Sequence, residues 1–599
     1  MIALGCYASA GPVSTPLLAR MKTLAKGSRY ASAILDQDGP FTFATAAHDH
    51  RRVNTPRGRL IHILGHAYDL GPPEHLDALL DAGRHLELTQ LSGNYVLVIW
   101  EPHSRTLSLM SDSLSSIPFY YARHGRDLLW GTSPRDFATD PSFRVEPSIE
   151  GIVSFLELGC VIGDATLAQG ISALRPREWL MFEGGRMRRT ARPLVFTKAR
   201  WHVPPGPLVD EFHEVLSSIV ARQVASHSKV NLLLSGGLDS RGLAGLLAGR
   251  VQLRTLTYGR WYLREVQLAR RVARSLGVEN LVVRYDPAFL AKHGREFSKA
   301  VGGQCDALHA FWRPLSEQVP SGVPLVIGYF LGVLYGQCLR YGGDAADHKT
   351  AVSAWLQHFS SGLFTADDLC SLLRPSFADV ARAYTLRTIC DIGDRYEYPF
   401  QAIFAIHLER QHRLISLLPG LFRERTSVLL PGTDRLLLEF VCSLAPMALD
   451  REHLYRQLLR RYYPALARIA YANDGLPPEP NLREQTSAYL NSLVRRWLAP
   501  LAPARLQRGR NIVASLAHLD SSTSGLWALL PELESGLDLI SEHVRPEAVR
   551  LLISRFRRDG TGGERLRALL SLVWYFRALR DVAASHYQQE SDYIAARTA

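Results

Sequence analysis

The sequence predicts an α/β fold built from three differently patterned parts. Short apolar runs separated by turn residues fill residues 1 to about 195 and indicate a mostly β region. Strand-like and helix-like runs then alternate from about residue 208, which is typical of a parallel, doubly wound sheet. Residues 350–599 have a mainly helical pattern. A chain of 599 residues is long enough for two to four domains.

The composition is that of a globular protein. Hydrophobic residues make up 47% and charged residues 21% of the chain. The formal net charge is +12, and no lysine follows Lys349 although arginine is abundant. This bias leaves two interpretations, a plain preference for arginine or a basic surface for an acidic peptide or nucleic acid. Because no aromatic-interleaved RNA-binding motif accompanies the charge, we do not expect nucleic acid as a partner.

The cysteines and the apolar runs indicate in which compartment the protein is found. Seven scattered cysteines form no CxxC pair and no metal-ligand spacing, which suits a reducing environment. The first residues lack a basic stretch followed by an apolar one, and no apolar run reaches 18 residues. We therefore expect a cytoplasmic protein with no membrane partner.

Four strands and a helix start are expected in the second half of the β region. The strands cover residues 93–100, 105–110, 118–122 and 127–130, and turn-like segments connect them. Ser133-Pro134 then has the residue types of a helix start.

The segment from Val230 to Gly242 is the most informative part of the chain. Val230–Leu234 is an apolar run of strand length, Ser-Gly-Gly follows as a turn, and leucines then recur at helical spacing. A strand, a tight turn and a helix start point backbone N–H groups and the positive end of the helix dipole at one spot, which suits an anion.

The residue types in that turn suit a nucleotide with a cation. Gly236 and Gly237 have no Cβ, so a phosphate can approach the backbone closely. Ser235 and Ser240 add hydroxyl donors. Asp239 would repel a bare phosphate, and its presence is explained if a divalent cation bridges the carboxylate to the nucleotide. The alternative is a glycine-rich turn of any α/β domain.

Ser235–Ser240 resembles the SGGxDS pyrophosphate loop of enzymes that cleave ATP to AMP and pyrophosphate, and it lacks the lysine of a Walker motif. Asparagine synthetases, β-lactam synthetases and lasso-peptide cyclases share this loop. The resemblance implies ATP and Mg²⁺ as cofactors, with Asp239 as the metal ligand. It assigns the following residues of this segment to the nucleotide site: Leu233, Ser235, Gly236, Gly237, Asp239 and Ser240.

Residues 91–137 resemble the glutaminase domain of the same family. Asp112 falls on the aspartate of its RD motif, Pro118-Phe-Tyr-Tyr on its PLYY motif, and Ile171–Pro176 on the segment that ends the domain. The resemblance implies an Ntn-type αββα domain in residues 1–200 and an ATP-dependent ligase domain in residues 201–599.

The catalytic thiol of such a glutaminase is not expected here. Working members expose cysteine as the N-terminal residue, whereas this chain starts Met1-Ile2. Removal of Met1 would not make Cys6 N-terminal, and no Asn-Gly oxyanion element is recognisable around Leu64–His66. We predict no glutamine hydrolysis, and we expect Cys6 to be a small buried residue.

The next strands resemble those of the family's ATP site. A strand at 253–259 and a helix after Glu265 match its second strand, with Thr257, Tyr258 and Gly259 expected along the adenine, and residues 278–284 form a third strand. Residues 324–336 then take the place of the second phosphate loop, where Gly328 fits. Gly332 stands where the family has an aspartate, a role that Asp344 or Asp347 could fill only if the loop were displaced.

The expected catalytic residues follow from the resemblance to the β-lactam synthetases and lie in the second phosphate loop and in the helical C-terminal part. Tyr329 falls where those enzymes have a tyrosine that assists proton removal, and Glu409, on a helix expected at 402–418, is its candidate partner. The alternative for Glu409 is a solvated helix carboxylate.

Residues 429–435 and 451–469 resemble family segments, the latter in its lasso-cyclase form. The lysine expected after them is absent, so Arg468 is the candidate for the adenylate, with a surface charge as the alternative.

Three functions compete, and we rank them in this order. The first is a lasso-peptide cyclase, which adenylates an Asp or Glu side chain of a peptide and closes a macrolactam with the N-terminal amine. Its implied partners are a precursor core peptide, a leader-binding protein and a leader peptidase. The second is an ammonia-dependent asparagine synthetase or a β-lactam-synthetase-like ligase. The third is a non-catalytic binding protein, which the missing aspartate and lysine favour and the intact Ser235–Ser240 loop opposes.

Overall fold

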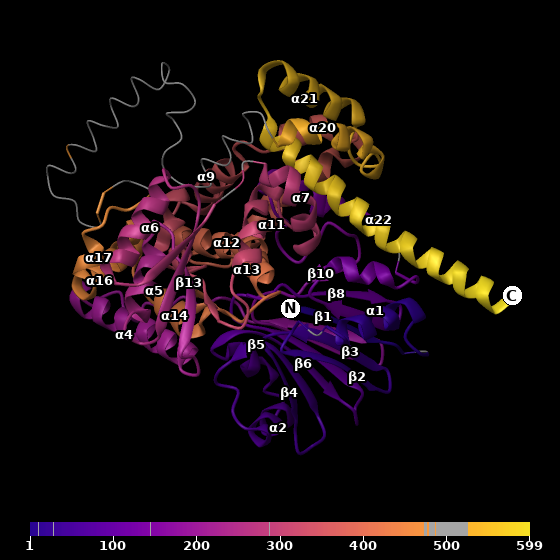
Figure 1. Cartoon of the computed structure of the whole chain (residues 1–599), viewed down its shortest axis with the longest axis horizontal. Helices are drawn as coiled ribbons and strands as arrows, with labels where there is room; N and C mark the ends of the chain where they lie inside the picture. Colours follow the sequence, from indigo (N-terminus) through magenta and orange to yellow (C-terminus); the bar gives the residue numbers. More distant parts are fainter. Residues whose placement is uncertain are drawn as a thin grey trace.

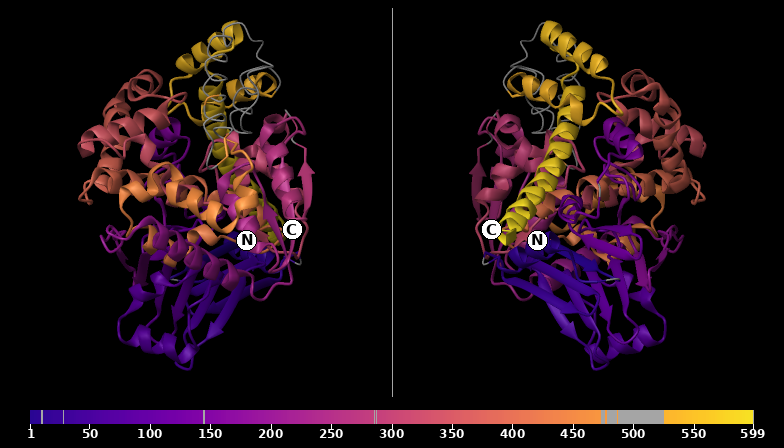
Figure 2. Two further views of the ribbon diagram at one scale, coloured as in Figure 1. Left: turned by 90° about the vertical axis from the view of Figure 1, so that its left-hand side faces the viewer. Right: turned by 90° about the vertical axis from the view of Figure 1, so that its right-hand side faces the viewer.

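The computed structural model describes residues 1–472 except positions 10, 28, 144, 285 and 287, and then residues 476, 477, 486 and 525–598. The side chains of residues 451 and 585–598 are not described. Figure 1 shows two β-sheets at one end of the molecule, a smaller sheet beside them, and helices above. The side views in Figure 2 show the same layering, with the long C-terminal helix running down one side toward the N-terminal sheets.

Two six-stranded antiparallel sheets face each other in the N-terminal part. Their orders are β10-β8-β9-β1-β3-β2 and β12-β11-β7-β6-β5-β4. The strands are β1 (Ile2–Tyr7), β2 (Ser32–Asp38), β3 (Phe41–Ala47), β4 (His50–Asn54), β5 (Leu60–Ala67), β6 (Gly93–Glu101), β7 (Thr106–Ser111), β8 (Tyr120–His124), β9 (Asp127–Gly131), β10 (Ile171–Ala173), β11 (Glu178–Glu183) and β12 (Arg186–Ala191). The predicted strands correspond to β6, β7, β8 and β9.

The layers around these sheets confirm the expected αββα arrangement. Aromatic side chains, including the stacked pair Phe41 and Trp100, fill the space between the sheets. Helix α1 (Thr15–Ala25) covers the outer face of the first sheet with apolar side chains. Helix α2 (Pro73–Asp81) and the 3₁₀ helix η1 (His85–Gln90) cover the second. The helix start predicted at Ser133 is the 3₁₀ helix η2 (Pro134–Thr139).

A five-stranded parallel sheet forms the second part, as the alternating pattern predicted. It consists of β13 (Lys229–Leu233), β14 (Gln252–Tyr258), β15 (Glu279–Val283), β16 (Leu325–Val326) and β17 (Val428–Leu429). The order is β15-β14-β13-β16-β17. The chain therefore adds strands on one side of β13 and then on the other, so the topological switch point lies at β13, where ligands of open α/β sheets bind.

Helices surround this sheet and continue to the C-terminus. Those that accompany the strands are α3 (Ile149–Leu158), α4 (Pro205–Val224), α5 (Leu238–Leu247), α6 (Arg264–Ser275), α7 (Phe289–Ala300), η3 (Ala307–Phe311), α8 (Trp312–Gln318), η4 (Val333–Gln337) and η5 (Leu339–Tyr341). Those of the helical part are α9 (His348–Ser360), α10 (Ala366–Leu372), η6 (Pro375–Phe377), α11 (Ala378–Gly393), α12 (Pro399–Leu414), α13 (Leu417–Phe422), η7 (Pro431–Thr433), α14 (Arg435–Val441), α15 (Pro446–Leu449), η8 (Asp450–Glu452), α16 (His453–Tyr462), α17 (Pro464–Ala467), α20 (Leu526–Ser535), η9 (Leu537–Leu539), α21 (Pro546–Asp559) and α22 (Gly563–Thr598). The helix expected at 402–418 is divided between α12 and α13.

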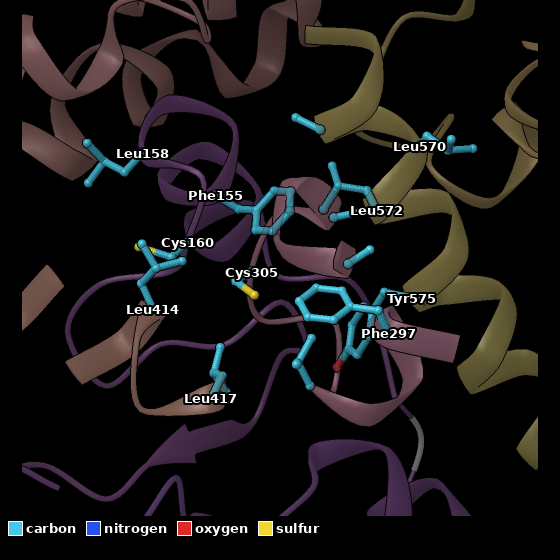
Figure 3. Close-up of a cluster of buried hydrophobic side chains, with 14 of the residues drawn as sticks. Phe155, Leu158, Cys160, Phe297, Cys305, Leu414, Leu417, Leu570, Leu572 and Tyr575 are labelled. Carbon is cyan, nitrogen blue, oxygen red and sulfur yellow. The ribbon is translucent and has the colours of Figure 1, made fainter. Parts of the chain in front are cut away.

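One apolar core joins the N-terminal part to the C-terminal helices. Figure 3 shows Phe155 of α3, Phe297 of α7, Leu414 of α12 and Tyr575 of α22 converging on it. A buried ion pair between Arg567 of α22 and Asp306, 3.0 Å apart, anchors the long helix beside this core. Because these helices come from segments far apart in the sequence, the core fixes α12 and α22 against the N-terminal part.

Two sequence expectations about the chain's surroundings can be compared with the structure. No helix among the described residues is both long and apolar enough to cross a membrane. All seven cysteines carry free thiols. Cys6 lies on β1 with 4% of its surface exposed, and burial raises the pKa of its thiol.

Candidate nucleotide site

A cavity of about 260 Å³ lies at the carboxyl ends of β13, β14 and β16, where the switch point predicts a ligand site. The structure brings many of the expected residues together around it. Its lining is Leu233, Leu234, Ser235, Asp239, Ser240, Leu256, Thr257, Tyr258, Glu265, Phe311, Trp312, Leu315, Ile327, Gly328 and Tyr329.

The loop after β13 is shaped by its own serines. The Ser235 N–H donates to Ser240 Oγ at 3.0 Å, and the two hydroxyl oxygens are 3.1 Å apart. The Gly237 N–H donates to Ser235 Oγ at 3.1 Å. A Cβ on Gly236 would lie 3.0 Å from the Ala472 Cβ and 3.1 Å from the Cα of Glu265, so a side chain here would press on both neighbours. Helix α5 follows at once, and its N-terminus suits an anion at this loop.

A buried arginine ties this loop to the segment after α17. Arg241 is fully buried, and its guanidinium donates to the carbonyl oxygens of Ile469 (2.6 Å), Ala470 (2.8 Å), Leu466 (3.2 Å) and Gly236 (3.3 Å). The Ala472 N–H also donates to the Gly236 oxygen, at 3.1 Å. Arg241 was not among the site residues expected from the sequence, although a charged residue on the apolar face of α5 was a signal.

Asp239 has the environment of a cation ligand. Its Oδ1 atom is buried and has no hydrogen-bond partner among the described residues, while the Gly332 N–H bonds to the carboxyl group. Burial, and secondarily the charge of Glu452, raise the pKa of Asp239 to about 8. A buried carboxylate with an unsatisfied oxygen beside a phosphate-binding turn fits Mg²⁺, which bridges carboxylates to phosphates.

Another part of the cavity wall is apolar and aromatic, which suits a base. Tyr258 stacks on Phe311 with ring centroids 5.7 Å apart, and Leu256, Trp312 and Leu315 complete the wall. Thr257 Oγ1 donates to the Leu234 oxygen at 2.8 Å, which joins β14 to the end of β13.

Gly259 lies just beyond Tyr258 at the end of β14. It takes φ +149°, and its N–H donates to the Val283 oxygen at 2.9 Å. This bond joins the end of β14 to β15, at the edge of the predicted adenine wall.

The second loop contributes Gly328 and Tyr329 but no carboxylate. A Cβ on Gly332 would lie 2.9 Å from Asp239 Oδ2, so this glycine adjoins the carboxylate. Neither of the expected substitutes lines the cavity. Asp344 is exposed, and Asp347 caps α9 by accepting the Thr350 N–H at 2.8 Å.

Tyr329 lines the cavity, but Glu409 lies elsewhere. Burial raises the pKa of Tyr329 well above its usual value, and its hydroxyl has no hydrogen-bond partner within the described part of the chain. Glu409 Oε1 accepts the Gly163 N–H at 3.0 Å and contacts His412 Nε2 at 3.2 Å. It lines another cavity, of about 490 Å³, between the N-terminal part and helices α11 and α12. The expected pairing of Tyr329 with Glu409 is therefore wrong, because this face of α12 packs on the N-terminal part.

Arg468 also lies outside the cavity lining. It follows α17 directly and its side chain is exposed, whereas its neighbours Leu466 and Ala467 are buried. Since residues 473–475 and most of 478–524 are outside the described residues, the structure places Arg468 only as a surface residue near the end of the described segment.

In the N-terminal part, Asp112 has a structural role. It is fully buried and accepts the N–H groups of Tyr95 (2.9 Å) and Leu114 (2.8 Å). These bonds fix the turn after β7, which explains an aspartate there. Gly65, within the segment that lacks the oxyanion element, has φ +84° and donates its N–H to the Asp49 oxygen.

Two family models and one curated relative match the chain. Residues 75–192 match the glutamine amidotransferase domain, and residues 211–314 match asparagine synthase. A segment of 175 residues is 25% identical to "Asparagine synthetase [glutamine-hydrolyzing] 3" of Bacillus subtilis (strain 168). The match covers 27% of this chain and 26% of that protein, so the chain spans about a quarter of the relative's length.

Solved structures give a weaker likeness. The allosteric regulatory enzyme of purine biosynthesis is 10% identical and covers 48% of this chain and 81% of its own, with a TM-score of 0.21. Glutamine phosphoribosylpyrophosphate amidotransferase from B. subtilis is 9% identical and covers 47% and 65%, with a TM-score of 0.20.

Proposed function

From the premise that the chain belongs to the asparagine-synthetase-like family, whose two domains it carries, we propose that it is an ATP-dependent, AMP-forming C–N ligase. The observation that carries the proposal is the cavity at β13. It combines the serine-glycine loop, the buried Asp239 carboxyl and an apolar slot in one place. A nucleotide needs all three: donors for its phosphates, a carboxylate for its metal, and a flat apolar wall for its base.

The proposed reaction starts by making the substrate carboxylate a better acyl donor. A carboxylate oxygen attacks the α-phosphorus of ATP, the bond to pyrophosphate breaks, and an acyl-adenylate forms. Bound Mg²⁺ would neutralise phosphate charge in this step. Asp239 would hold that ion, and the Ser235 and Ser240 hydroxyls with the α5 N-terminus would hold the phosphates.

An amine then attacks the acyl carbon, AMP leaves, and the amine must lose a proton. Tyr329 and Glu265 line the same cavity and are the groups we assign to proton removal. Glu265 takes the place that was expected of Glu409, because Glu409 faces the N-terminal part.

For the substrate, we propose a peptide whose Asp or Glu side chain is joined to its own N-terminal amine, as in lasso-peptide cyclases. A macrolactam needs no ammonia, and the buried Cys6 thiol is in no position to release ammonia from glutamine. The resemblance of residues 451–469 to the lasso-cyclase form supports the same choice. The partners proposed with it are a precursor core peptide, a leader-binding protein and a leader peptidase.

The test is incubation of the protein with Mg²⁺-ATP and a linear peptide encoded beside this gene. We expect the peptide to lose one water by mass and AMP to accumulate in equal amount. Omission of ATP and the Asp239→Asn variant are the controls. AMP formation with no ring closure on any neighbouring peptide would overturn the peptide substrate but not the ligase.

A second candidate is an amide ligase for small molecules, either an ammonia-dependent asparagine synthetase or a β-lactam-synthetase-like enzyme. The name of the matching relative favours it. Steady AMP release with free aspartate and ammonium, and none with peptides, would select this candidate. The third candidate, a non-catalytic relative, predicts nucleotide binding without AMP formation, which the same assay with an ATP-binding measurement distinguishes.

A further inference from the structure

The cavity has one metal-binding carboxylate in its first loop and none in its second. Gly332 lies in that second loop with α-helical backbone angles (φ −57°, ψ −36°), which any residue can adopt. Its missing Cβ would lie 2.9 Å from Asp239 Oδ2 and 3.2 Å from Gln337 Oε1. Two side-chain oxygens therefore lie directly against this glycine, and an added side chain would require them to shift.

A buried carboxylate from a distant segment reaches the same place. Glu452 ends η8, is 6% exposed, and lies 115 positions from Gln337 in the sequence. Gln337 Nε2 donates to Glu452 Oε1 at 3.4 Å, while its Oε1 adjoins Gly332. Asp239, Gly332, Gln337 and Glu452 thus form one contiguous group.

The backbone at Glu452 is held in an unusual conformation. Its φ is +60°, in the left-handed region that glycine favours and glutamate rarely adopts. Such a conformation is unfavourable and persists where the surroundings impose it, often at functional sites. The Glu452 side chain also pairs with Arg456 of α16 at 3.6 Å.

We propose that Glu452 is the second carboxylate ligand of the divalent cation and replaces the aspartate missing at Gly332. The inference rests on the proposed function, since it concerns the metal of the same nucleotide site. A cation between Asp239 and Glu452 would offset the repulsion between their carboxylates, beyond what the Arg456 partner of Glu452 offsets. Mg²⁺ is commonly held by one or two carboxylates together with substrate phosphates and water. The described residues contain no cluster of three His, Cys, Asp or Glu side chains that could hold a metal, so phosphates and water would have to supply the remaining ligands.

The test measures metal binding rather than activity. Mn²⁺ is titrated into the full-length protein with a non-hydrolysable ATP analogue, and free Mn²⁺ is followed by electron paramagnetic resonance. We expect Glu452→Gln to weaken Mn²⁺ binding about 10- to 100-fold. Glu439→Gln is the matched control, because Glu439 is an exposed partner of Arg435 on α14 and should leave the affinity unchanged.

A second variant tests the replacement itself. Gly332→Asp in the Glu452→Gln background returns a carboxylate to the second loop, where only the ends of flexible side chains need to shift. We expect this double variant to recover most of the lost Mn²⁺ affinity. A well-folded Glu452→Gln protein with wild-type affinity would overturn the proposal.

A measurement on the wild-type protein covers the case in which the variants do not fold. Fe²⁺ with ascorbate and peroxide cleaves a backbone close to the bound metal, and Mg²⁺ should compete with it. We expect cuts near residues 239, 332 and 452, and cuts near 239 without any near 452 would overturn the proposal. If the protein forms AMP while Glu452 proves irrelevant to the metal, this inference fails and the proposed function stands. If no nucleotide binds, both fail.

Discussion

Replacing Arg241 by methionine tests whether the nucleotide loop depends on its tether to the segment after α17. Methionine has a similar reach and no donors, so the change removes the guanidinium while filling much of its volume. The carbonyl oxygens of Leu466, Ile469, Ala470 and Gly236 lose their common donor. The loop would then keep its internal serine bonds, the Ala472 N–H and the Tyr455 hydroxyl, which lies 3.2 Å from the Leu238 and Asp239 oxygens.

The expected loss follows from the burial of these groups. A buried carbonyl left without a donor costs about 1–3 kcal/mol, but removal of a buried charge returns part of that penalty. The four losses share one side chain and are not additive, so we expect the free energy of unfolding to fall by about 2–4 kcal/mol. Displacement of the Gly236 carbonyl should also weaken ATP binding by about tenfold or more, equivalent to about 1.4 kcal/mol.

Urea denaturation and calorimetric titration with a non-hydrolysable ATP analogue measure the two effects. Arg250→Met is the control, because Arg250 follows α5 at the surface and donates to Ser217 instead. That variant should stay within about 0.5 kcal/mol of the wild type. If Arg241→Met has the wild-type urea midpoint and affinity, the tether has no role in holding the loop.

Three further predictions concern single side chains. Asp239→Asn should abolish AMP formation while circular dichroism shows an intact fold, and an active variant would remove Asp239 from the metal site. Tyr329→Phe should slow amide formation about 100-fold in single-turnover assays without changing ATP affinity, and an unchanged rate would exclude its hydroxyl from proton removal. Burial raises the pKa of Glu157 on α3 to about 7. Between about pH 4.5 and pH 7 the folded protein therefore binds one proton more than the unfolded chain. The free energy of unfolding consequently falls as the pH rises through this range, and the stability that the protonated Glu157 gives below pH 4.5 is lost at about pH 7. Glu157→Gln should match the wild type in urea denaturation at pH 4 and exceed it by about 3 kcal/mol at pH 8, and equal stability at both values would contradict a buried, neutral Glu157.

Local patterns were enough to predict the loop at β13. An apolar run, a Ser-Gly-Gly turn and a leucine stripe specify strand, turn and helix within residues 230–247, and the structure has β13 and α5 there. The parallel sheet was predictable for the same reason, since each strand and helix has its own period. The position of Ser235, Asp239 and Ser240 in the cavity follows from these elements alone.

The predicted pairing of Tyr329 with Glu409 failed because it depended on which segments meet in the fold. Glu409 lies on a correctly predicted helix, but its partners, Gly163 and His412, show that the residue faces the N-terminal part. Helical periodicity gives the angular position of a side chain and not the identity of the neighbour it meets. Arg241 was missed for a related reason, because three of its four acceptors are more than 220 positions away.

Gly332 illustrates how far such non-local contacts change a functional argument. Taken along the chain, the glycine removes a carboxylate from the second loop and favours a protein without catalysis. In the fold, Gly332 adjoins the side chain of Gln337, which bonds to the buried Glu452. Besides burial, which has the larger effect, the charge of Glu452 raises the pKa of Asp239, so a second carboxylate lies close enough to act on it. A cation responds to the oxygens that surround it and not to the segments that supply them, so the glycine at 332 is not by itself an argument against metal-dependent chemistry.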